Sequence, residues 1–320
     1  MTHRILQAGR LLPSLEARLA SEFDTHRLAG EPDPQAFLAA QGAGFEGLVT
    51  SAGVGLSAAT MDLMPKLRVV SSFGVGLDRL DLAAAKARGI AVGYTPEVLN
   101  DCVADLAMAL LLDVARRISE ADRYVRRGSW TTPGLASFPL ARKVSGARLG
   151  IVGLGRIGQT IARRAGGFEM DIRYHSRRPV PGVPWPHAPV LTELARWCDF
   201  LVVITAGGPG TRHLIDAEVL DALGPRGFLV NVARGSVIDE PALVRALVDR
   251  RIAGAGLDVF ENEPNVPPEL FALDNVVLLP HIASGTEETR QAMAERAFDN
   301  LQGFFRDGRM VSPAPWPDEE

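Results

Sequence analysis

The sequence predicts an α/β protein made of two Rossmann-like domains, each with a doubly wound parallel sheet, and three observations support this fold class. The chain has 320 residues, enough for two domains at roughly 150 residues each. Short apolar runs alternate with helical patterns along most of it, which is typical of βαβ units. The apolar runs of the second half are continuous rather than alternating, as in strands that are covered on both faces.

A first series of βα units begins at Arg4 and extends to the segment Tyr94-Thr95-Pro96. After it, apolar residues recur at helical spacing from residue 100 to residue 127. We therefore predict one long helix there, capped by Asn100 or Asp101 and ended by Gly128. The other elements expected in this series are strands at 5–8, 47–50 and 68–71 and helices at 15–23 and from about 58.

A second βα series begins at Ala147. The last predicted helix of the chain covers 287–306, and it is followed by a Pro-rich, acidic tail at 313–320 that we expect to be poorly ordered. The strands expected in the second series are 149–152, 171–175, 200–204, 228–232, 255–259 and 276–279.

Charge and cysteine content exclude several classes of protein. A net charge of −4 provides no general attraction to nucleic acid or anionic membranes, so neither is an expected partner. Cys102 and Cys198 lack the spacing of a metal site or a redox pair, and no metal is expected. Because no apolar stretch of about 18 residues and no signal-like apolar core occur, we expect a cytoplasmic protein.

A glycine-rich turn follows the first strand of the second series. It reads Gly153-Leu154-Gly155-Arg156-Ile157-Gly158, a G-x-G-x-x-G between a predicted strand and a predicted helix. In that context the motif predicts a dinucleotide site, since the glycines permit a tight turn and the helix N-terminus offers N–H groups to a pyrophosphate. The expected cofactor contacts are Gly153, Gly155, Arg156, Ile157 and Gly158. The alternative is a βα turn without a ligand.

The strand at 171–175 is followed by Ser176-Arg177-Arg178. An NAD site places a carboxylate about 20 residues after the glycine motif to bind the ribose 2′-hydroxyl. A hydroxyl and two guanidinium groups instead suit a 2′-phosphate, which a carboxylate would repel. We therefore expect NADP(H) to be preferred, with NAD(H) possible, and Ser176, Arg177 and Arg178 to bind the cofactor. The alternative is that both arginines are solvated loop charges.

Three ionisable residues follow predicted strands of the second series: Arg234, Glu263 and His281. Open α/β sheets build their sites beyond the carboxyl ends of their strands. We therefore expect these three side chains to converge on the nicotinamide edge of the cofactor.

Several of these motifs together resemble the D-isomer-specific 2-hydroxyacid dehydrogenase family. They are the glycine motif, residues 231–235, residues 254–260 with Glu263-Pro264, and Pro280-His281. The similarity extends from Arg4 to about Arg306. The loop at 72–78 and the basic residues 176–178 are most similar to hydroxypyruvate and glyoxylate reductases, including hydroxyphenylpyruvate reductases.

The resemblance implies a domain arrangement. A flavodoxin-like substrate domain would contain residues 1–99 and 287–320, and an NAD(P)-binding Rossmann domain, residues 100–286, would be inserted into it. It also implies an active site in the cleft between these domains. A homodimer is expected, with the long helix and the arm from Trp130 to Leu140 in the subunit contact; whether Trp130 reaches the neighbouring site stays open.

The implied activity is reduction of a small 2-oxo acid, such as hydroxypyruvate or glyoxylate, to the D-2-hydroxy acid. Negative charge develops on the carbonyl oxygen, so the site needs a cation and a proton donor. Arg234 suits the first task and His281 the second, with Glu263 orienting the ring. Further expected substrate contacts are the N–H groups of Val75 and Gly76, Ser284, and the loop at 51–55. Further expected cofactor contacts are Ala206, Thr211, Val232, Ala233, Arg234, Asp258 (with the nicotinamide carboxamide), His281 and Ala283.

The same fold also serves nucleotide-sensing corepressors, which remain an alternative of another class. Formate dehydrogenases are disfavoured by Glu263, because they have Gln there. Phosphoglycerate dehydrogenases are disfavoured because no extra basic residues for a substrate phosphate are evident. The side chain of the substrate stays open.

Overall fold

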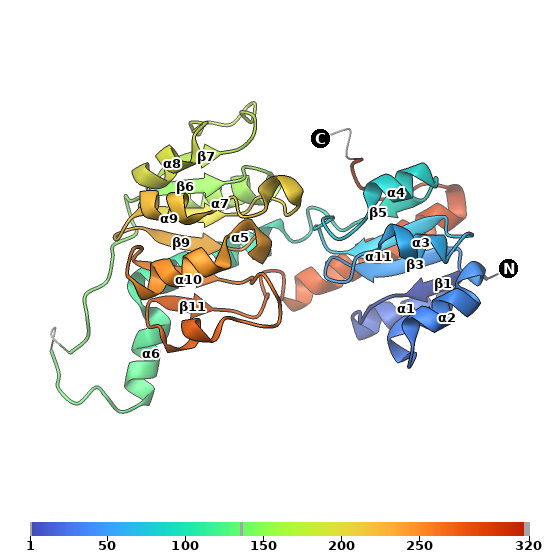
Figure 1. The fold of residues 1–320 in the computed structure, drawn as a ribbon, viewed down its shortest axis with the longest axis horizontal. Helices are drawn as coiled ribbons and strands as arrows, with labels where there is room; N and C mark the ends of the chain where they lie inside the picture. Colours follow the sequence, from blue (N-terminus) through green and yellow to red (C-terminus); the bar gives the residue numbers. More distant parts are fainter. Residues whose placement is uncertain (1, 135–136, 317–320) are drawn as a thin grey trace. The chain divides into compact units, whose positions relative to one another are not determined.

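The computed structural model describes residues 2–134 and 137–316, and the chain divides into two compact units (Figure 1). Unit 1 contains Met1–Leu99 and Thr286–Glu320, and unit 2 contains Asn100–Gly285. Each unit is built around a parallel sheet with helices packed on it. The predicted α/β fold class is confirmed.

Unit 1 has a five-stranded parallel sheet in the order β2-β1-β3-β4-β5. This is the flavodoxin-like order, and it places a topological switch point beside β1. Strands β2 and β5 were missed by the sequence analysis, because both are short edge strands and β2 (DTHR) has almost no apolar signal. The strands are β1 (Arg4–Gln7), β2 (Asp24–Arg27), β3 (Gly47–Ser51), β4 (Val69–Phe73) and β5 (Ala91–Gly93).

The helices of unit 1 include one from the far end of the chain. This helix is α11 (Glu287–Asp307), in which the carbonyl oxygen of Ala297 accepts a hydrogen bond from Ser71 Oγ of β4 at 2.8 Å. Thr286 caps α11 by accepting from Thr289 N–H at 3.3 Å, and Gly308 ends it with φ 75°. The helices are α1 (Pro13–Glu22), η1 (Leu28–Gly30), α2 (Pro34–Gln41), η2 (Gly42–Gly44), α3 (Ala58–Asp62), α4 (Leu82–Ala87) and α11 (Glu287–Asp307).

The segment after α11, as far as Trp316, is docked on unit 1. Pro313 pairs with Gly93, and Ala314 N–H donates to Val92 O at 2.8 Å. Ala314 is buried, and Trp316 packs against the apolar core of the unit. The prediction of a poorly ordered tail is therefore wrong for these residues, because the segment supplies partners to the edge strand β5. The rest of the predicted tail, residues 317–320, lies outside the described part of the chain.

Unit 2 has a six-stranded parallel sheet in the order β11-β10-β9-β8-β6-β7. The chain leaves β6 for β7 on one side and then crosses to β8 on the other, so the strand order reverses beside β6. Doubly wound sheets bind ligands at such a switch point. The strands are β6 (Arg148–Val152), β7 (Asp171–His175), β8 (Phe200–Val203), β9 (Phe228–Asn231), β10 (Gly254–Leu257) and β11 (Val276–Leu278).

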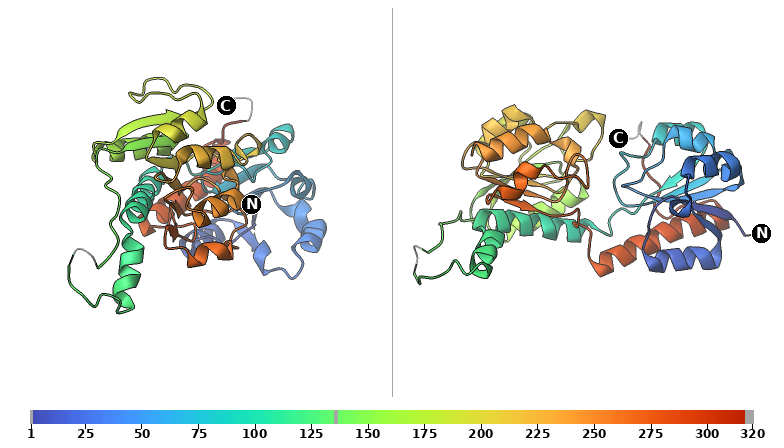
Figure 2. Two further views of the ribbon diagram at one scale, coloured as in Figure 1. Left: turned by 60° about the vertical axis from the view of Figure 1, so that its left-hand side comes forward. Right: turned by 60° about the horizontal axis from the view of Figure 1, so that its bottom comes forward.

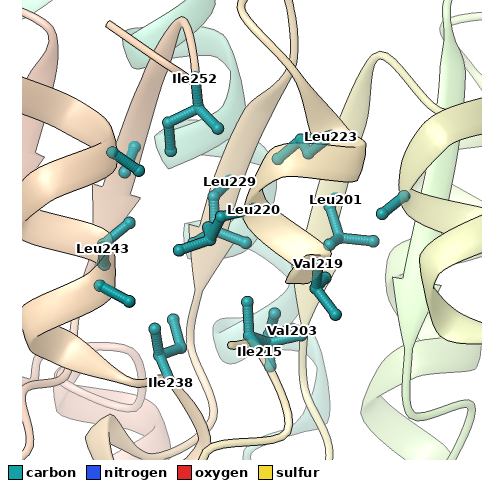
Figure 3. Packing of buried hydrophobic residues seen from close by; sticks show 14 of the residues in the cluster. Leu201, Val203, Ile215, Val219, Leu220, Leu223, Leu229, Ile238, Leu243 and Ile252 are labelled. Atoms are coloured by element: carbon teal, nitrogen blue, oxygen red, sulfur yellow. The ribbon is translucent and has the colours of Figure 1, made fainter. Parts of the chain in front are cut away.

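Leucine, valine and isoleucine side chains from the strands and helices of unit 2 form one buried cluster, seen in Figure 3. Leu201 and Leu229 from the sheet meet Leu220 and Leu243 from the helices, and all four are almost fully buried. Two of these helices begin at aspartates, Asp216 for α9 and Asp239 for α10, each accepting a backbone N–H at 3.0 Å. The helices are α5 (Asn100–Arg116), α6 (Ile118–Arg126), α7 (Arg156–Gly166), α8 (Leu191–Trp197), η3 (Pro209–Thr211), α9 (Ala217–Leu223), η4 (Gly235–Val237), α10 (Glu240–Val248) and η5 (Pro268–Ala272).

The predicted long helix is two helices, and this expectation was wrong. Helix α5 starts at Asn100, but Arg117 adopts a left-handed conformation (φ 57°, ψ 39°) that separates it from α6. The Asp113 carboxylate accepts hydrogen bonds from the Ser119 N–H at 2.8 Å and hydroxyl at 2.5 Å, which stabilises the start of the second helix. The predicted end at Gly128 is confirmed, with φ 69°. In Figure 2 helix α6, drawn in green, projects from the rest of unit 2.

Candidate active site

The glycine-rich loop connects β6 to α7 at the switch point of unit 2. A Cβ added at Gly153 (φ 97°) would lie 2.7 Å from Thr205 Cα, and one at Gly158 would lie 2.2 Å from Gly153 O. Larger residues are therefore excluded at both positions. A Cβ at Gly155 would have no protein atom within 4 Å. The loop is thus closely packed at Gly153 and Gly158 and open at Gly155, beside the first turn of α7. Arg156 in that turn is exposed and Ile157 is half-buried. This open space at a helix N-terminus fits a pyrophosphate.

The basic turn after β7 lies at the carboxyl edge of the same sheet. Ser176 Oγ donates to the carbonyl oxygen of Arg178 at 2.6 Å, and both arginines are exposed. His175, the last residue of β7, engages Ala188 O through Nδ1 at 2.9 Å. The turn that carries an acidic residue in an NAD site therefore carries a serine and two exposed arginines here.

Arg234 follows β9 in a turn that its neighbours hold tightly. The buried Asn231 accepts from Ala233 N–H at 3.0 Å and donates to Arg234 O at 3.1 Å. Arg234 is half-buried, and its Nη1 donates to Ala233 O at 2.8 Å. A Cβ at Gly235 would lie 1.9 Å from the carbonyl carbon of Phe260. Glycine therefore allows this turn to contact the segment that carries Glu263. The sequence analysis placed Asn231 in one of the family motifs and did not predict this positioning role.

His281 and Glu263 form a direct pair. His281 Nδ1 donates to Glu263 Oε2 at 2.8 Å, and the two side chains keep 45% and 34% of their surface exposed. The other carboxylate oxygen, Oε1, accepts from Phe260 N–H at 3.1 Å. Burial by itself would raise the pKa of Glu263, but the hydrogen bond and charge of His281, the Phe260 N–H and the nearby Arg234 outweigh it and lower the pKa. Glu263 is therefore an anion that stabilises an imidazolium.

Asp258 holds the loop that carries His281 through backbone hydrogen bonds. His281 has φ 55°, and its N–H donates to Asp258 O at 2.9 Å. The two carboxylate oxygens accept from Ile282 N–H at 2.7 Å and Ala283 N–H at 2.9 Å. The side chain is fully buried, and burial raises its pKa despite these hydrogen bonds. Through these two hydrogen bonds Asp258 orients the loop that carries His281. The sequence signal for this role was the position of Asp258 directly after an apolar strand. The expected contact of Asp258 with the nicotinamide carboxamide stays a prediction.

The other residues expected to line the cofactor follow β8, β9 and β11. Because carboxyl ends of parallel strands share one edge of a sheet, these loops gather at the edge that holds the glycine loop. Thr211 Oγ1 donates a hydrogen bond to the carbonyl oxygen of Ala206 at 2.7 Å. Ala206 is exposed. Val232, Ala233 and Ala283 are buried and could reach a ligand mainly through their backbone. Ser284, an expected substrate contact, is half-buried.

The expected carboxylate-binding loop lies in unit 1, after β4. Gly74 (φ 142°) donates its N–H to Thr95 Oγ1 at 3.0 Å, which shapes the turn. Val75 and Gly76 follow it and are half-buried. The loop at 51–55 packs beside this turn, since Ala52 N–H donates to Phe73 O at 3.2 Å. Both loops therefore lie at the carboxyl edge of the unit 1 sheet.

Within residues 2–134 and 137–316, no group of three or more His, Cys, Asp or Glu side chains could hold a metal ion. No helix formed by these residues is both long and apolar enough to span a bilayer. Burial raises the pKa of Cys198 to about 12, so its thiol is a packing group rather than a nucleophile.

Known proteins resemble this chain over almost all of its length. Residues 108–283 match the D-isomer specific 2-hydroxyacid dehydrogenase NAD-binding domain. A hydroxyphenylpyruvate reductase of Plectranthus scutellarioides is 48% identical over 299 residues, 93% of this chain and 95% of that protein. A glyoxylate/hydroxypyruvate reductase A of Arabidopsis thaliana is 45% identical over 299 residues, again 93% and 95%.

A solved structure shares the fold as well as the sequence. It is an NADPH-dependent glyoxylate/hydroxypyruvate reductase of Sinorhizobium meliloti in complex with NADP and malonate. The TM-score is 0.90 at 42% identity, covering 98% of this chain and 97% of that one. Together with the matched NAD-binding domain and the two close relatives, this shows that the chain belongs to the D-isomer specific 2-hydroxyacid dehydrogenase family and is an oxidoreductase.

Proposed function

We propose that this protein is an NADP(H)-preferring reductase that converts a small 2-oxo acid, such as hydroxypyruvate or glyoxylate, to the D-2-hydroxy acid. The observation that carries the proposal is the 2.8 Å contact between His281 and Glu263, at the sheet edge that also holds the glycine loop. The names of the relatives support the substrate class, and the NADP complex supports the cofactor.

The reaction needs a hydride at the carbonyl carbon and a proton at its oxygen. Bound NADPH supplies the hydride. The Nδ1 of His281 is occupied by Glu263, so Nε2 is the nitrogen that donates the proton. Arg234 binds the carboxylate and the carbonyl oxygen, where negative charge develops. Asp258 keeps the His281 loop in place through two backbone N–H groups.

The remaining contacts are assigned by position. The N–H groups of Val75 and Gly76 bind the substrate carboxylate, and Ser284 contacts the substrate. Unit 1 is thus the substrate domain and unit 2 the cofactor domain. The glycine loop holds the pyrophosphate and the turn Ser176–Arg178 the 2′-phosphate, while Ala206, Thr211, Val232, Ala233 and Ala283 line the cofactor.

The direct test is a spectrophotometric assay of NADPH oxidation with hydroxypyruvate, glyoxylate and hydroxyphenylpyruvate. We expect turnover with at least one of them and a higher kcat/KM with NADPH than with NADH. If no 2-oxo acid supports oxidation while NADPH still binds, the corepressor-like alternative gains over the reductase.

A Glu263→Gln variant is expected to lose reduction activity at lower pH than the wild type does. Reduction requires protonated His281, and the variant removes the carboxylate that stabilises the imidazolium. The pKa of Glu263 is lowered, so the wild-type carboxylate is charged where the amide of the variant is neutral. The pH profile of kcat measures this shift.

The matched control is Glu46→Gln, which alters a similar pair, His3 Nδ1 and Glu46 Oε2 at 3.1 Å, at the amino edge of the unit 1 sheet. It should leave the profile in place. An unshifted profile in Glu263→Gln would remove Glu263 from this role.

A homodimer is also proposed, with helices α5 and α6 and the arm from Trp130 to Leu140 in the subunit contact. Ile118 and Val125 lie on one face of α6 and are half exposed, and Trp130 and Leu140 in the arm are 60% and 91% exposed. Exposed large apolar side chains of this kind are suited to an interaction surface. Residues 135–136 of the expected arm lie outside the described residues. Wild-type protein that sediments as a dimer, with a Leu140→Asp variant that sediments as a monomer, would support this proposal.

The cytoplasmic location stays a prediction.

A further inference from the structure

Residues 176–187 form a loop that leaves β7 and returns beside it. Tyr174 N–H donates to Pro186 O at 3.1 Å, and Ala188 N–H donates to Tyr174 O at 2.7 Å. Both ends of the loop are therefore attached to the same strand. Four prolines restrict the backbone between them, at positions 179, 181, 184 and 186.

Tyr174 supports this loop from inside. Its side chain is only 1% exposed, and its hydroxyl oxygen accepts a hydrogen bond from Val180 N–H at 2.8 Å. Val180 is two residues beyond Arg178. The hydroxyl thus fixes the backbone on the far side of the basic turn.

His187 supports the near side of the turn. Its Nε2 lies 2.9 Å from the carbonyl oxygen of Ser176. A carbonyl oxygen can only accept, so Nε2 carries the hydrogen. The ring is 5.2 Å from that of Tyr174. With the bond from Ser176 Oγ to Arg178 O, the backbone is held at Ser176, Arg178 and Val180 before any ligand arrives.

We propose that Tyr174 and His187 are positioning residues for cofactor choice. They hold the turn Ser176–Arg178 in the conformation that receives a 2′-phosphate, without touching the cofactor themselves. Without them, binding would have to order the loop and two long side chains, and that entropy cost would reduce affinity. NADH has no 2′-phosphate to gain from an ordered basic turn. This inference rests on the proposed preference for NADP(H).

The competing explanation is that both side chains only pack the edge of unit 2. A packing defect would weaken both cofactors equally, or lower stability without changing their ratio. A positioning role predicts a selective loss for ligands that carry the 2′-phosphate. The ratio of the two dissociation constants therefore separates the explanations.

The test is calorimetric titration of the full chain with NADPH and NADH, and with adenosine 2′,5′-bisphosphate against AMP. Tyr174→Phe removes a single oxygen atom. We expect it to weaken NADPH and the bisphosphate about two- to tenfold, the range for one neutral hydrogen bond, and to leave NADH, AMP and kcat at saturating NADPH unchanged. Tyr94→Phe is the matched control and should change none of these constants.

A second pair of variants guards against misfolding. His187→Ala should show the same selective loss, and His187→Gln, whose amide still offers an N–H donor to Ser176 O, should restore part of it. Equal losses for both cofactors, or unchanged NADPH binding in Tyr174→Phe and His187→Ala, would overturn the inference. Wild-type protein that binds NADPH and NADH equally would instead refute the proposed cofactor preference, and the inference with it.

Discussion

Replacing His281 with alanine is expected to lower kcat for 2-oxo acid reduction by about 10²- to 10⁴-fold, the usual contribution of a general acid, while the Kd for NADPH stays nearly unchanged. The reason is geometric. Nδ1 is committed to Glu263 at 2.8 Å and the side chain is 45% exposed, so Nε2 can deliver a proton to a substrate. That interaction develops in the transition state and therefore appears in kcat.

Steady-state kinetics with hydroxypyruvate, together with NADPH titration, measure this effect. His3→Ala is the matched control, because His3 also pairs with a glutamate, Glu46, at 3.1 Å but at the amino edge of the unit 1 sheet. It should keep wild-type turnover. Near wild-type kcat in His281→Ala would show that another group supplies the proton.

An Arg177→Ala, Arg178→Ala double variant is expected to raise the Kd for NADPH roughly tenfold to several hundredfold. Charge-assisted hydrogen bonds contribute about 1.5–3 kcal/mol each, and this range corresponds to the loss of one such bond, or of two at the lower end. The Kd for NADH should change little. The two cofactors differ only in the 2′-phosphate, and both guanidinium groups are exposed in the turn after β7. Adding Ser176→Asp should favour NADH further, because a carboxylate accepts from the ribose hydroxyl and repels the phosphate.

Binding constants for both cofactors, at one ionic strength, decide this prediction. Arg250→Ala, Arg251→Ala is the control: it removes an adjacent arginine pair from the turn just before β10, at the opposite, amino edge of the same sheet. That variant should keep the wild-type ratio. An equal loss for NADPH and NADH in the first double variant would mean that Arg177 and Arg178 are only solvated loop charges.

Much of the fold was predictable because its signals are local. A continuous apolar run indicates a buried parallel strand wherever it occurs in the chain. The runs at 149–152 and 228–232 correspond to β6 and β9. The glycine motif is also local: Gly153 needs a positive φ and Gly158 a close approach to Gly153 O, and both needs arise within six residues. Family membership followed from several such motifs in order.

By itself, the sequence determined the α/β class, most of the strands, the glycine loop, the basic turn and the candidate set Arg234, Glu263 and His281. The tertiary structure alone decided the strand orders, the break at Arg117, the docking of Ala314 on β5, and the use of Asp258 to hold the His281 loop. The physical reason is that hydrophobic periodicity reports which face of an element is buried. It does not report which distant backbone group a buried carboxylate, a hydroxyl or an edge strand will satisfy, and those hydrogen bonds depend on segments that folding brings together.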